Sequence, residues 1–322
     1  MIKKIKSLLF SFFKFVYNVF KKTLLKKIPG MATLANNIFR MVWPSVNIIE
    51  VQGSKMFIDV NEKNPGLRQT FQAYAMNRIH EETTTNIFRK IIKPSNIFLD
   101  LGANIGYFSL LAAKLAGENG KIFSFEPEPK NFYYLQKNIE VNNYKNIHPF
   151  QKAVSDKNGA TELFICEYDS GHHTIKQYEG VEIYSHGRPT EKKPIKIETI
   201  SLDKFLEDKV NHVDVIKIDI EGAEVLAVGG MKNILNKNRN IKILMEFFPL
   251  FIKKMGDSPE KLIKTLMDEL GFNIFVIGHD YSMEKEKNDF IKIRKIEDLM
   301  ALIKDKEDHL NLYISRETAP LF

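Results

Sequence analysis

The stretch IFLDLGANIG, residues 97–106, decides the fold of this chain. It begins with an apolar run of strand length and leads directly into YFSLLAAKLAG, residues 107–117, which has the composition of a helix. Between the two lies a short segment with one carboxylate, one amide and two glycines: Asp100, Gly102, Asn104 and Gly106. This order predicts a strand, a tight turn and the start of a helix.

A second segment, IFSFEP at residues 122–127, ends its apolar run in Glu126. The acid follows the turn by roughly twenty residues, the spacing of a nucleoside-binding βαβ unit whose acidic residue binds ribose hydroxyls. An ionised carboxylate only accepts hydrogen bonds, so Glu126 can accept from both hydroxyls of a ribose. The two segments together predict a nucleoside site.

From residue 81 onward, apolar runs alternate with helix-like stretches. We expect helices over residues 82–92, 131–138, 221–230 and 259–270. We expect strands over residues 97–101, 213–219, 241–247, 271–278 and 310–316, and a further strand within residues 146–154. This alternation predicts an α/β fold with a mainly parallel sheet covered on both faces. Ligands of such sheets bind at the carboxyl ends of the strands. Four acids are expected at that edge: Asp100, Glu126, Asp219 and Glu246.

The N-terminal part of the chain has a different pattern. Residues 1–28 place apolar side chains on one broad helical face and lysines on the opposite one, which predicts a basic amphipathic helix. Such a helix can lie on an anionic membrane, where each lysine contributes about 1 kcal/mol, or dock on protein. Lys14 interrupts its apolar run, so the segment is not expected to span a bilayer. Residues 31–80 are expected to form an extension with a β-hairpin around Gly53, and residues 81–322 to form the main domain.

Composition limits the class of protein. With 322 residues and a hydrophobic fraction of 44%, the chain can bury a large core. Much of the excess positive charge behind the net +7 lies in the N-terminal helix, so nucleic-acid binding by the main domain is not expected. Cys166 is the single cysteine, which excludes an intrachain disulfide and a Cys-rich metal site, and no other spacing indicates a metal. We expect a cytoplasmic protein that lies at the inner face of the membrane if the N-terminal helix binds it.

The turn distinguishes between two nucleoside cofactors. In a dinucleotide-binding G-x-G-x-x-G turn, aligned on Gly102, the second and third glycines would stand at the positions of Asn104 and Tyr107. The turn is therefore unsuited to NAD. It suits a nucleoside that carries a small zwitterion, because a helix N-terminus can meet a carboxylate and Asp100 is placed for a cation. S-adenosylmethionine combines these parts.

Five strings carry a resemblance to a known family. They are DLGANIGYFSLLAAKLAGENGKIFSFEPEP, NIEVNN, AVSDKNG, TISLDKFL and VIKIDIEGAEVLAVGG, found in this order between residues 100 and 230. With them the chain resembles the FkbM family of S-adenosylmethionine-dependent methyltransferases. The resemblance implies a class I, Rossmann-like fold with a mostly parallel seven-stranded sheet whose last strand is antiparallel. It also implies methyl transfer to a hydroxyl oxygen, on acceptors such as sugars of glycans and glycolipids or polyketide hydroxyls.

The resemblance also implies roles for single residues. The residues that match cofactor-binding positions are Glu81, Asp100, Gly102, Asn104, Gly106, Glu126 and Asp219. Glu81 matches an acid implied to contact the methionine end, and Asp219 and Glu221 match the acids of the second motif. The segment DSGHHT, residues 169–174, departs from the Ser-rich stretch expected there, so the acceptor side is not defined.

Methyl transfer to oxygen needs little from the protein besides alignment and a base. Alignment can supply about 7–11 kcal/mol of the barrier, and a base adds roughly 10²–10⁴-fold. Asp219 is the first candidate base and Glu221 the second, while His172 and His173 are alternatives because an ordinary histidine pKa lies near 6.5. Lys217 shares a strand face with Asp219, so we expect an ion pair that lowers the pKa of the carboxylate.

Two other functions stay open from the residues alone. One is a nicotinamide-dependent oxidoreductase, against which Asn104 and Tyr107 argue. The other is a noncatalytic, membrane-associated binding module with the same fold, against which the intact acids of both motifs argue. N-methylation of nucleic-acid bases is disfavoured, because IDIEGAE stands where an Asn-Pro-Pro-Tyr-like loop would follow the strand at 213–219. The expected partners are therefore the methyl donor and a saccharide or glycolipid acceptor.

Overall fold

The computed structural model describes most of the chain, over residues 46–76, 79–166, 193–277, 290–303 and 309–320, with isolated residues elsewhere. The amphipathic helix predicted over residues 1–28 lies outside the described residues, apart from Phe12 and Val16. None of the described helices combines the length and the hydrophobicity that crossing a lipid bilayer requires.

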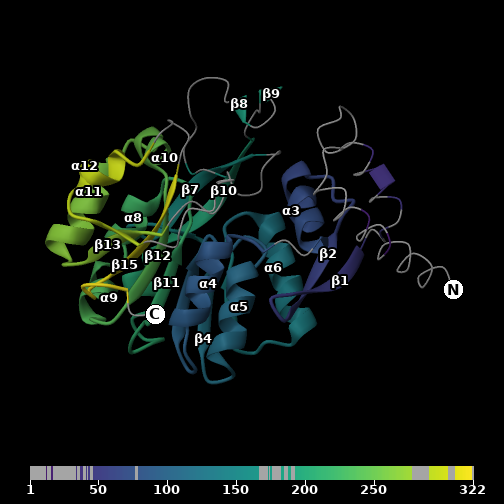
Figure 1. Ribbon diagram of the computed structural model, residues 1–322, viewed down its shortest axis with the longest axis horizontal. Coiled ribbons are helices and arrows are strands. Elements are labelled where there is room, and N and C mark those ends of the chain that lie inside the picture. Colours follow the sequence, from purple (N-terminus) through teal and green to yellow (C-terminus); the bar gives the residue numbers. More distant parts are fainter. Residues whose placement is uncertain are drawn as a thin grey trace.

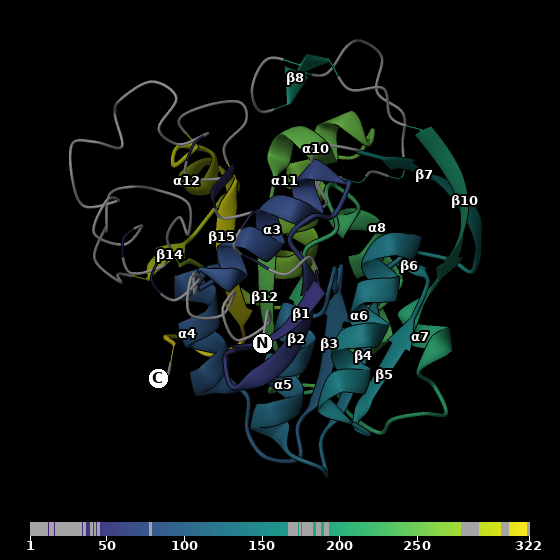
Figure 2. The ribbon, with the colours of Figure 1, turned by 90° about the vertical axis from the view of Figure 1, so that its right-hand side faces the viewer.

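An eight-stranded sheet organises the described chain (Figures 1 and 2). From edge to edge its strands are β14 (Ile291–Ile293), β13 (Asn273–Val276), β15 (Leu310–Ser315), β12 (Lys242–Phe247), β11 (Val215–Ile218), β3 (Ile97–Leu101), β4 (Lys121–Phe125) and β5 (Ile147–Phe150). The strands from β12 to β5 pair in parallel, whereas β15 lies antiparallel between β12 and β13. The predicted α/β fold, with its antiparallel last strand, is confirmed, and β14 adds an edge strand to the seven predicted.

Alternate residues of the strands face two helix layers. Ile97 and Leu99 pack in one apolar cluster, and Phe98 between them packs in the other. The first layer contains α7 (Leu202–Phe205), α8 (Glu224–Gly229), α9 (Lys232–Lys237), α10 (Pro249–Lys254), α11 (Pro259–Lys264) with a π-helical turn (Thr265–Glu269), and α12 (Ile296–Met300). The second contains α3 (Pro65–Ala75), α4 (Glu82–Ile91), α5 (Tyr107–Ala116) and α6 (Pro129–Asn142). Burial on both faces explains the continuous apolar runs of the central strands.

A smaller sheet lies beside the central one (Figure 2). Its strands are β6 (Ala153–Val154), β10 (Lys193–Ile200) in the middle and β7 (Gly159–Ile165), and a further pair joins β8 (Ile183–Tyr184) to β9 (Arg188–Pro189). The strand predicted within residues 146–154 is β5, and the same residues also contain β6, in the smaller sheet. The reason is a tight turn, in which the amide of Lys152 donates to the carbonyl of Phe150 (2.9 Å) and takes the chain out of the first ladder.

Helix α6 begins earlier than the sequence predicts. Pro129 is its first residue rather than a stop, because a proline lacks only an N–H that the first turn leaves unpaired. Glu128 caps the helix, and its side chain accepts from the amide of Asn131 (2.5 Å). The helix also extends to Asn142, beyond the predicted end at Asn138.

The extended length of α6 holds the N-terminal hairpin, formed by β1 (Val46–Val51) and β2 (Ser54–Asp59). The side chain of Asn138 accepts from the amide of Phe57 (2.6 Å), and Asn142 accepts from the amide of Lys55 (2.7 Å). Asn138 also donates to the carbonyl of Ile105 (2.7 Å), in the loop after β3. One buried amide therefore connects the predicted hairpin to the turn that decides the fold.

Asn138→Ala should lower the free energy of unfolding by about 1–3 kcal/mol, because it leaves the buried amide of Phe57 and carbonyl of Ile105 without this partner. Urea denaturation measures the change. Glu140→Ala, on the exposed side of the same helix, should change the stability by less than about 0.5 kcal/mol, since its pairing with Lys137 is solvated. Equal effects of the two substitutions would contradict this role of Asn138.

Candidate functional site

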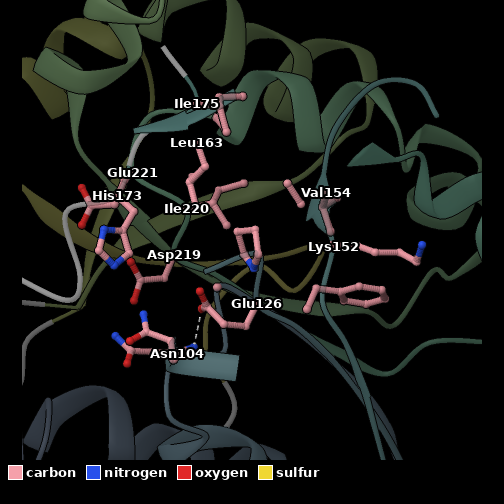
Figure 3. Close-up of a pocket in the computed structure, with 16 residues that line it drawn as sticks. Asn104, Glu126, Lys152, Val154, Leu163, His173, Ile175, Asp219, Ile220 and Glu221 are labelled. Carbon is pink, nitrogen blue, oxygen red and sulfur yellow. Dashed lines mark hydrogen bonds between the residues drawn. The ribbon is translucent and has the colours of Figure 1, made fainter. Parts of the chain in front are cut away.

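A cleft lies at the carboxyl ends of β3, β4 and β11 and is closed on its other side by β6 and β7. It encloses about 640 Å³, including the part open to solvent. Figure 3 shows Asn104, Glu126 and Asp219 close to one another in this cleft, with Leu163 and Ile175 opposite them. The cleft therefore has a polar side, built from the two predicted motifs, and an apolar side.

The turn after β3 requires glycine at residue 102. Gly102 has a φ of +82°, and a Cβ atom placed on it would lie 1.8 Å from the carbonyl oxygen of Asp219. The amides of Gly102 and Ala103 both donate to the carbonyl of Phe125 (3.0 Å each). The turn thus packs directly on the ends of β4 and β11, which brings both motifs to one place.

Glu126 is buried beside the turn, with both carboxylate oxygens turned to backbone amides. Its Oε2 accepts from the amide of Asn104 (2.8 Å), and its Oε1 accepts from the amide of Glu128 (2.9 Å). Burial raises the pKa of Glu126 to about 8, although these two amides favour the ionised form. A carboxylate has lone pairs beyond these two bonds, so Glu126 can also accept from the hydroxyls of a ribose.

Asp100 lies beneath the cleft rather than on its surface. It is 1% exposed, and its Oδ2 accepts from the hydroxyl of Ser109 (2.5 Å), which in turn contacts the hydroxyl of Ser124 (2.8 Å). Burial raises the pKa of Asp100 to about 6, against the favourable charge of Lys217. The cation near Asp100 in the structure is therefore a lysine of the chain itself.

The ion pair expected between Lys217 and Asp219 is confirmed, with 2.6 Å between Nζ and Oδ2. Burial would raise the pKa of Asp219, but the charge and hydrogen bond of Lys217, together with the hydrogen bond shared with Glu246, lower it to about 2. Burial likewise opposes the charge on Lys217, while Asp219, Glu81 and Asp100 raise its pKa. Asp219 lines the cleft but is a weak base by itself.

Glu81 also faces the charge of Lys217. It precedes α4 with a φ of +42°, a backbone conformation that non-glycine residues rarely adopt outside functional or over-determined positions. Its Oε1 lies 3.0 Å from Nε2 of His80. Burial opposes ionisation of Glu81, but Lys217 and His80 lower its pKa. The predicted residue therefore belongs to the same charge cluster as Asp219.

Two further acids lie next to Asp219. Carboxylate oxygens of Asp219, Glu221 and Glu246 lie within 4.8 Å of one another. Burial and the charges of Asp219 and Glu221 raise the pKa of Glu246 well above its usual range, and Glu246 shares a hydrogen bond with Asp219. This bond between two acids requires a proton, which Glu246 donates. Lys217 and that proton already compensate the charges of this pair, so we assign no metal ion to it.

The loop that carries Glu221 is held in a strained conformation. Glu221 has a φ of +52° and Gly222 a φ of +98°, and a Cβ on Gly222 would lie 2.7 Å from the backbone of Phe251. Glu224 closes the loop, because its Oε1 accepts from the amide of Gly222 (3.0 Å). The IEGAE string therefore encodes a tight turn that presents Glu221 beside Asp219.

The two histidines of the polar loop differ in what the structure says of them. His172 lies outside the described residues. His173 lines the cleft, and its Nδ1 accepts from the amide of Cys166 (3.0 Å). When Nδ1 accepts, the neutral ring carries its proton on Nε2, so His173 cannot take a further proton there in this arrangement. Of the two side chains, Asp219 is therefore the one with an oxygen at the cleft that can accept a proton in this arrangement.

Sequence reasoning missed the pairing of His309 with Glu246, whose Nε2 and Oε1 atoms lie 3.3 Å apart. His309 directly precedes β15, and an antiparallel strand begins at the edge where the parallel strands end. The predicted antiparallel last strand could therefore have indicated that His309 lies at the edge of the sheet where the acids gather. The apolar side chains of Val154, Leu163 and Ile175 gave no such signal, because they resemble any core residue until β6 and β7 fold over the cleft.

Comparisons with known proteins show the family of this chain. The family model of the methyltransferase FkbM domain matches residues 100–274. A 2-O-methyltransferase, NoeI, of Sinorhizobium fredii is 25% identical over 193 residues, which are 54% of this chain and 75% of that protein. The hexuronic acid methyltransferase AglP of Haloferax volcanii is 24% identical over 158 residues, 48% of this chain and 58% of that protein. Membership of a methyltransferase family argues against the alternative that this chain is a nicotinamide-dependent oxidoreductase.

Two solved structures have weaker likenesses. Methyltransferase FkbM from Methylobacillus flagellatus has a TM-score of 0.37 and 12% identity, and the likeness covers 77% of this chain and 53% of that one. TYW2 of M. jannaschii, solved in complex with AdoMet, has a TM-score of 0.37 and 12% identity. That likeness covers 85% of this chain and 88% of the TYW2 chain. At these values the function is argued from the family match and from the site.

Glu126→Gln should weaken binding of S-adenosylhomocysteine by about 10- to 100-fold, because an amide replaces an ionised acceptor of two hydroxyls. In the wild type, affinity should rise from about pH 6 to about pH 8 and then level off, since only the ionised form accepts both hydroxyls and the pKa of the free chain is about 8. Titration calorimetry measures both effects.

The exposed variant Glu118→Gln serves as the control, and it should keep the wild-type affinity and pH dependence. Tight, pH-independent binding by the Glu126→Gln protein would show that this carboxylate does not hold the ribose.

Proposed function

This chain belongs to the methyltransferase FkbM domain family and is an S-adenosylmethionine-dependent methyltransferase, and from that premise we propose that it methylates a hydroxyl oxygen of a saccharide. Two relatives support the acceptor class, since one is a 2-O-methyltransferase and the other a hexuronic acid methyltransferase. The observation that carries the proposal is the position of Asp219, a carboxylate that lines the nucleoside cleft beside Glu221.

The cleft residues fit the parts of the cofactor. Glu126 would accept hydrogen bonds from the ribose hydroxyls. The apolar side chains of Val154, Leu163 and Ile175 would pack on the adenine ring. The end of the cleft at Gly102 and Asp219 would then hold the methionine part, with Glu81 nearby in the same charge cluster. When bound, S-adenosylmethionine supplies an electrophilic methyl group on a sulfonium.

The chain has two tasks in such a transfer. It must hold the acceptor oxygen in line with the methyl group, and alignment of this kind contributes about 7–11 kcal/mol. It must also take the hydroxyl proton as the new bond forms, which contributes roughly 10²–10⁴-fold. Asp219 is the acid at the cleft that we assign to proton removal, and Glu221 is placed to orient the acceptor.

Radiolabel transfer tests the proposal. Glycans and glycolipids extracted from cells that lack the gene should accept the labelled methyl group of S-adenosylmethionine from the purified protein. Their mass should increase by one CH2 unit, because the methyl group replaces a hydrogen. Asp219→Asn should lower the rate by about 10²-fold or more, because the amide cannot take the proton. Asp208→Asn, at an exposed position, should leave the rate unchanged.

The stability of the label identifies the bond. A methyl ether resists alkali, so label that survives base treatment in the saccharide fraction supports transfer to a hydroxyl. Label released by alkali would instead indicate an ester of a hexuronic acid, and label in nucleic acid or protein would overturn the proposed acceptor class.

We also propose that residues 1–28 attach the enzyme to an anionic membrane, where lipid-linked saccharides would be within reach. The lysine-rich face of the segment supports this. Phe12 and Val16, the residues of the segment that the structure describes, are exposed and available to a lipid surface.

Removal of residues 1–28 should abolish binding to vesicles that contain phosphatidylserine but leave binding of S-adenosylhomocysteine intact, because the cleft is built by later residues. Flotation with the full chain should show binding that weakens as salt is added and is absent on neutral phosphatidylcholine vesicles. A full chain that never floats with anionic vesicles would assign the segment a packing role.

A further inference from the structure

We propose that Glu246 and His309 form a proton relay behind Asp219, in which Asp219 takes the acceptor's hydroxyl proton while Glu246 passes its own proton to His309. The inference rests on the proposed transfer to a hydroxyl and adds two residues to it. Asp219 would touch the acceptor, whereas Glu246 and His309 act through it and are positioning residues.

The need for a relay follows from the partner of Asp219. Lys217 lies 2.6 Å from its Oδ2 and strongly favours the ionised carboxylate. A carboxylate so stabilised holds a proton poorly, so it cannot retain the proton of a hydroxyl unless its surroundings change in the same step. A second negative charge beside Asp219 would make that change.

Glu246 can supply this charge. It shares a hydrogen bond with Asp219, and of the two acids it is the one whose pKa is raised, by burial first and by Asp219 and Glu221 next. The pair therefore holds one proton and titrates as a unit. If Glu246 loses its proton, its charge lies directly against Asp219, and the proton affinity of Asp219 increases.

His309 stands on the far side of Glu246 with a nitrogen placed to receive that proton. Its Nε2 lies 3.3 Å from Oε1 of Glu246. The ring packs on Phe248, with 5.8 Å between the ring centres. The His309 side chain is 25% exposed, so the ring can exchange a proton with solvent.

The charged groups around the pair act on it from several elements. Asp219, Glu221 and Glu81 act on Glu246. Lys217 and His80 act on Asp219. A proton that arrives on His309 lies next to the carboxylate that Glu246 has then become, and this opposite charge stabilises it.

The step balances in atoms and electrons. The acceptor O–H bond breaks as the oxygen forms its bond to the methyl carbon, and the electron pair of the S–C bond goes to sulfur. An O–H bond forms on Asp219, the O–H bond of Glu246 breaks, and an N–H bond forms on His309. After release of the products, His309 gives a proton to solvent and Asp219 returns its own to Glu246.

His309→Gln and Glu246→Gln test the relay with the glycan extract as acceptor. Each amide keeps a hydrogen-bonding side chain but cannot carry the proton, so kcat should fall about 10- to 100-fold, with KM and S-adenosylhomocysteine affinity within about twofold of the wild type. His212→Gln is the matched control. His212 lies 3.3 Å from Asp214, the same distance as in the relay pair, but at the amino end of β11.

The pH profile separates a relay from a structural ion pair. The wild-type kcat should decline as pH falls through the range in which a histidine titrates, and the His309→Gln protein should lose that limb. A proton inventory in mixtures of light and heavy water should be curved for the wild type and linear for the variant, because two protons move in one step only when the relay is intact.

A His309→Gln protein with wild-type kcat and an unchanged acidic limb would overturn the relay while leaving the proposed function standing. If His309→Gln does not fold, the same outcomes apply to Glu246→Gln, which removes the middle of the relay. Absence of transfer by the wild type, with S-adenosylhomocysteine still bound, would instead overturn the proposed function, and the relay with it.

Discussion

A buried ammonium group at the carboxyl edge of the sheet is the constraint on which the site depends. Lys217 is 5% exposed, and the acids around it come from separate parts of the chain: Glu81 before α4, Asp100 in β3 and Asp219 after β11. A buried charge costs several kcal/mol unless opposite charges compensate it. Lys217 and its carboxylates therefore specify one another, and together they bring the start of α4, strand β3 and the second motif to one point.

The same constraint divides the cleft into two parts with different chemistry. Around Glu126 the polar contacts are backbone amides, and the opposite wall is apolar, which suits recognition of a neutral nucleoside. Around Asp219 the contacts are ionised or protonated side chains, which suits movement of a proton. Strained backbone lies at both parts, at Asn104 and at Glu221, as is common where function rather than stability selects the conformation.

The fold was largely predictable because its signals are local. The apolar runs of β3, β4, β11 and β12 and the turn residues between them follow from neighbouring residues in the chain. Two details of the boundaries were not predicted, for a local reason as well: Pro129 starts α6 instead of preceding it, and the turn at Lys152 divides residues 146–154 between two sheets. In both places the local sequence is compatible with two conformations, and packing against the rest of the chain determines which one forms.

By itself, the sequence determined the α/β fold, the edge at which the acids gather and the family to which the chain belongs, because each depends on order and spacing along the chain. The tertiary structure determined how readily each acid gives up its proton. Asp219 and Glu246 are both strand-end carboxylates, yet the pKa of one is lowered by Lys217 and that of the other is raised by burial and by its neighbour. The glycine-bearing turn of residues 97–106 could not reveal this difference, since a proton's position depends on distances between residues that are far apart in the chain.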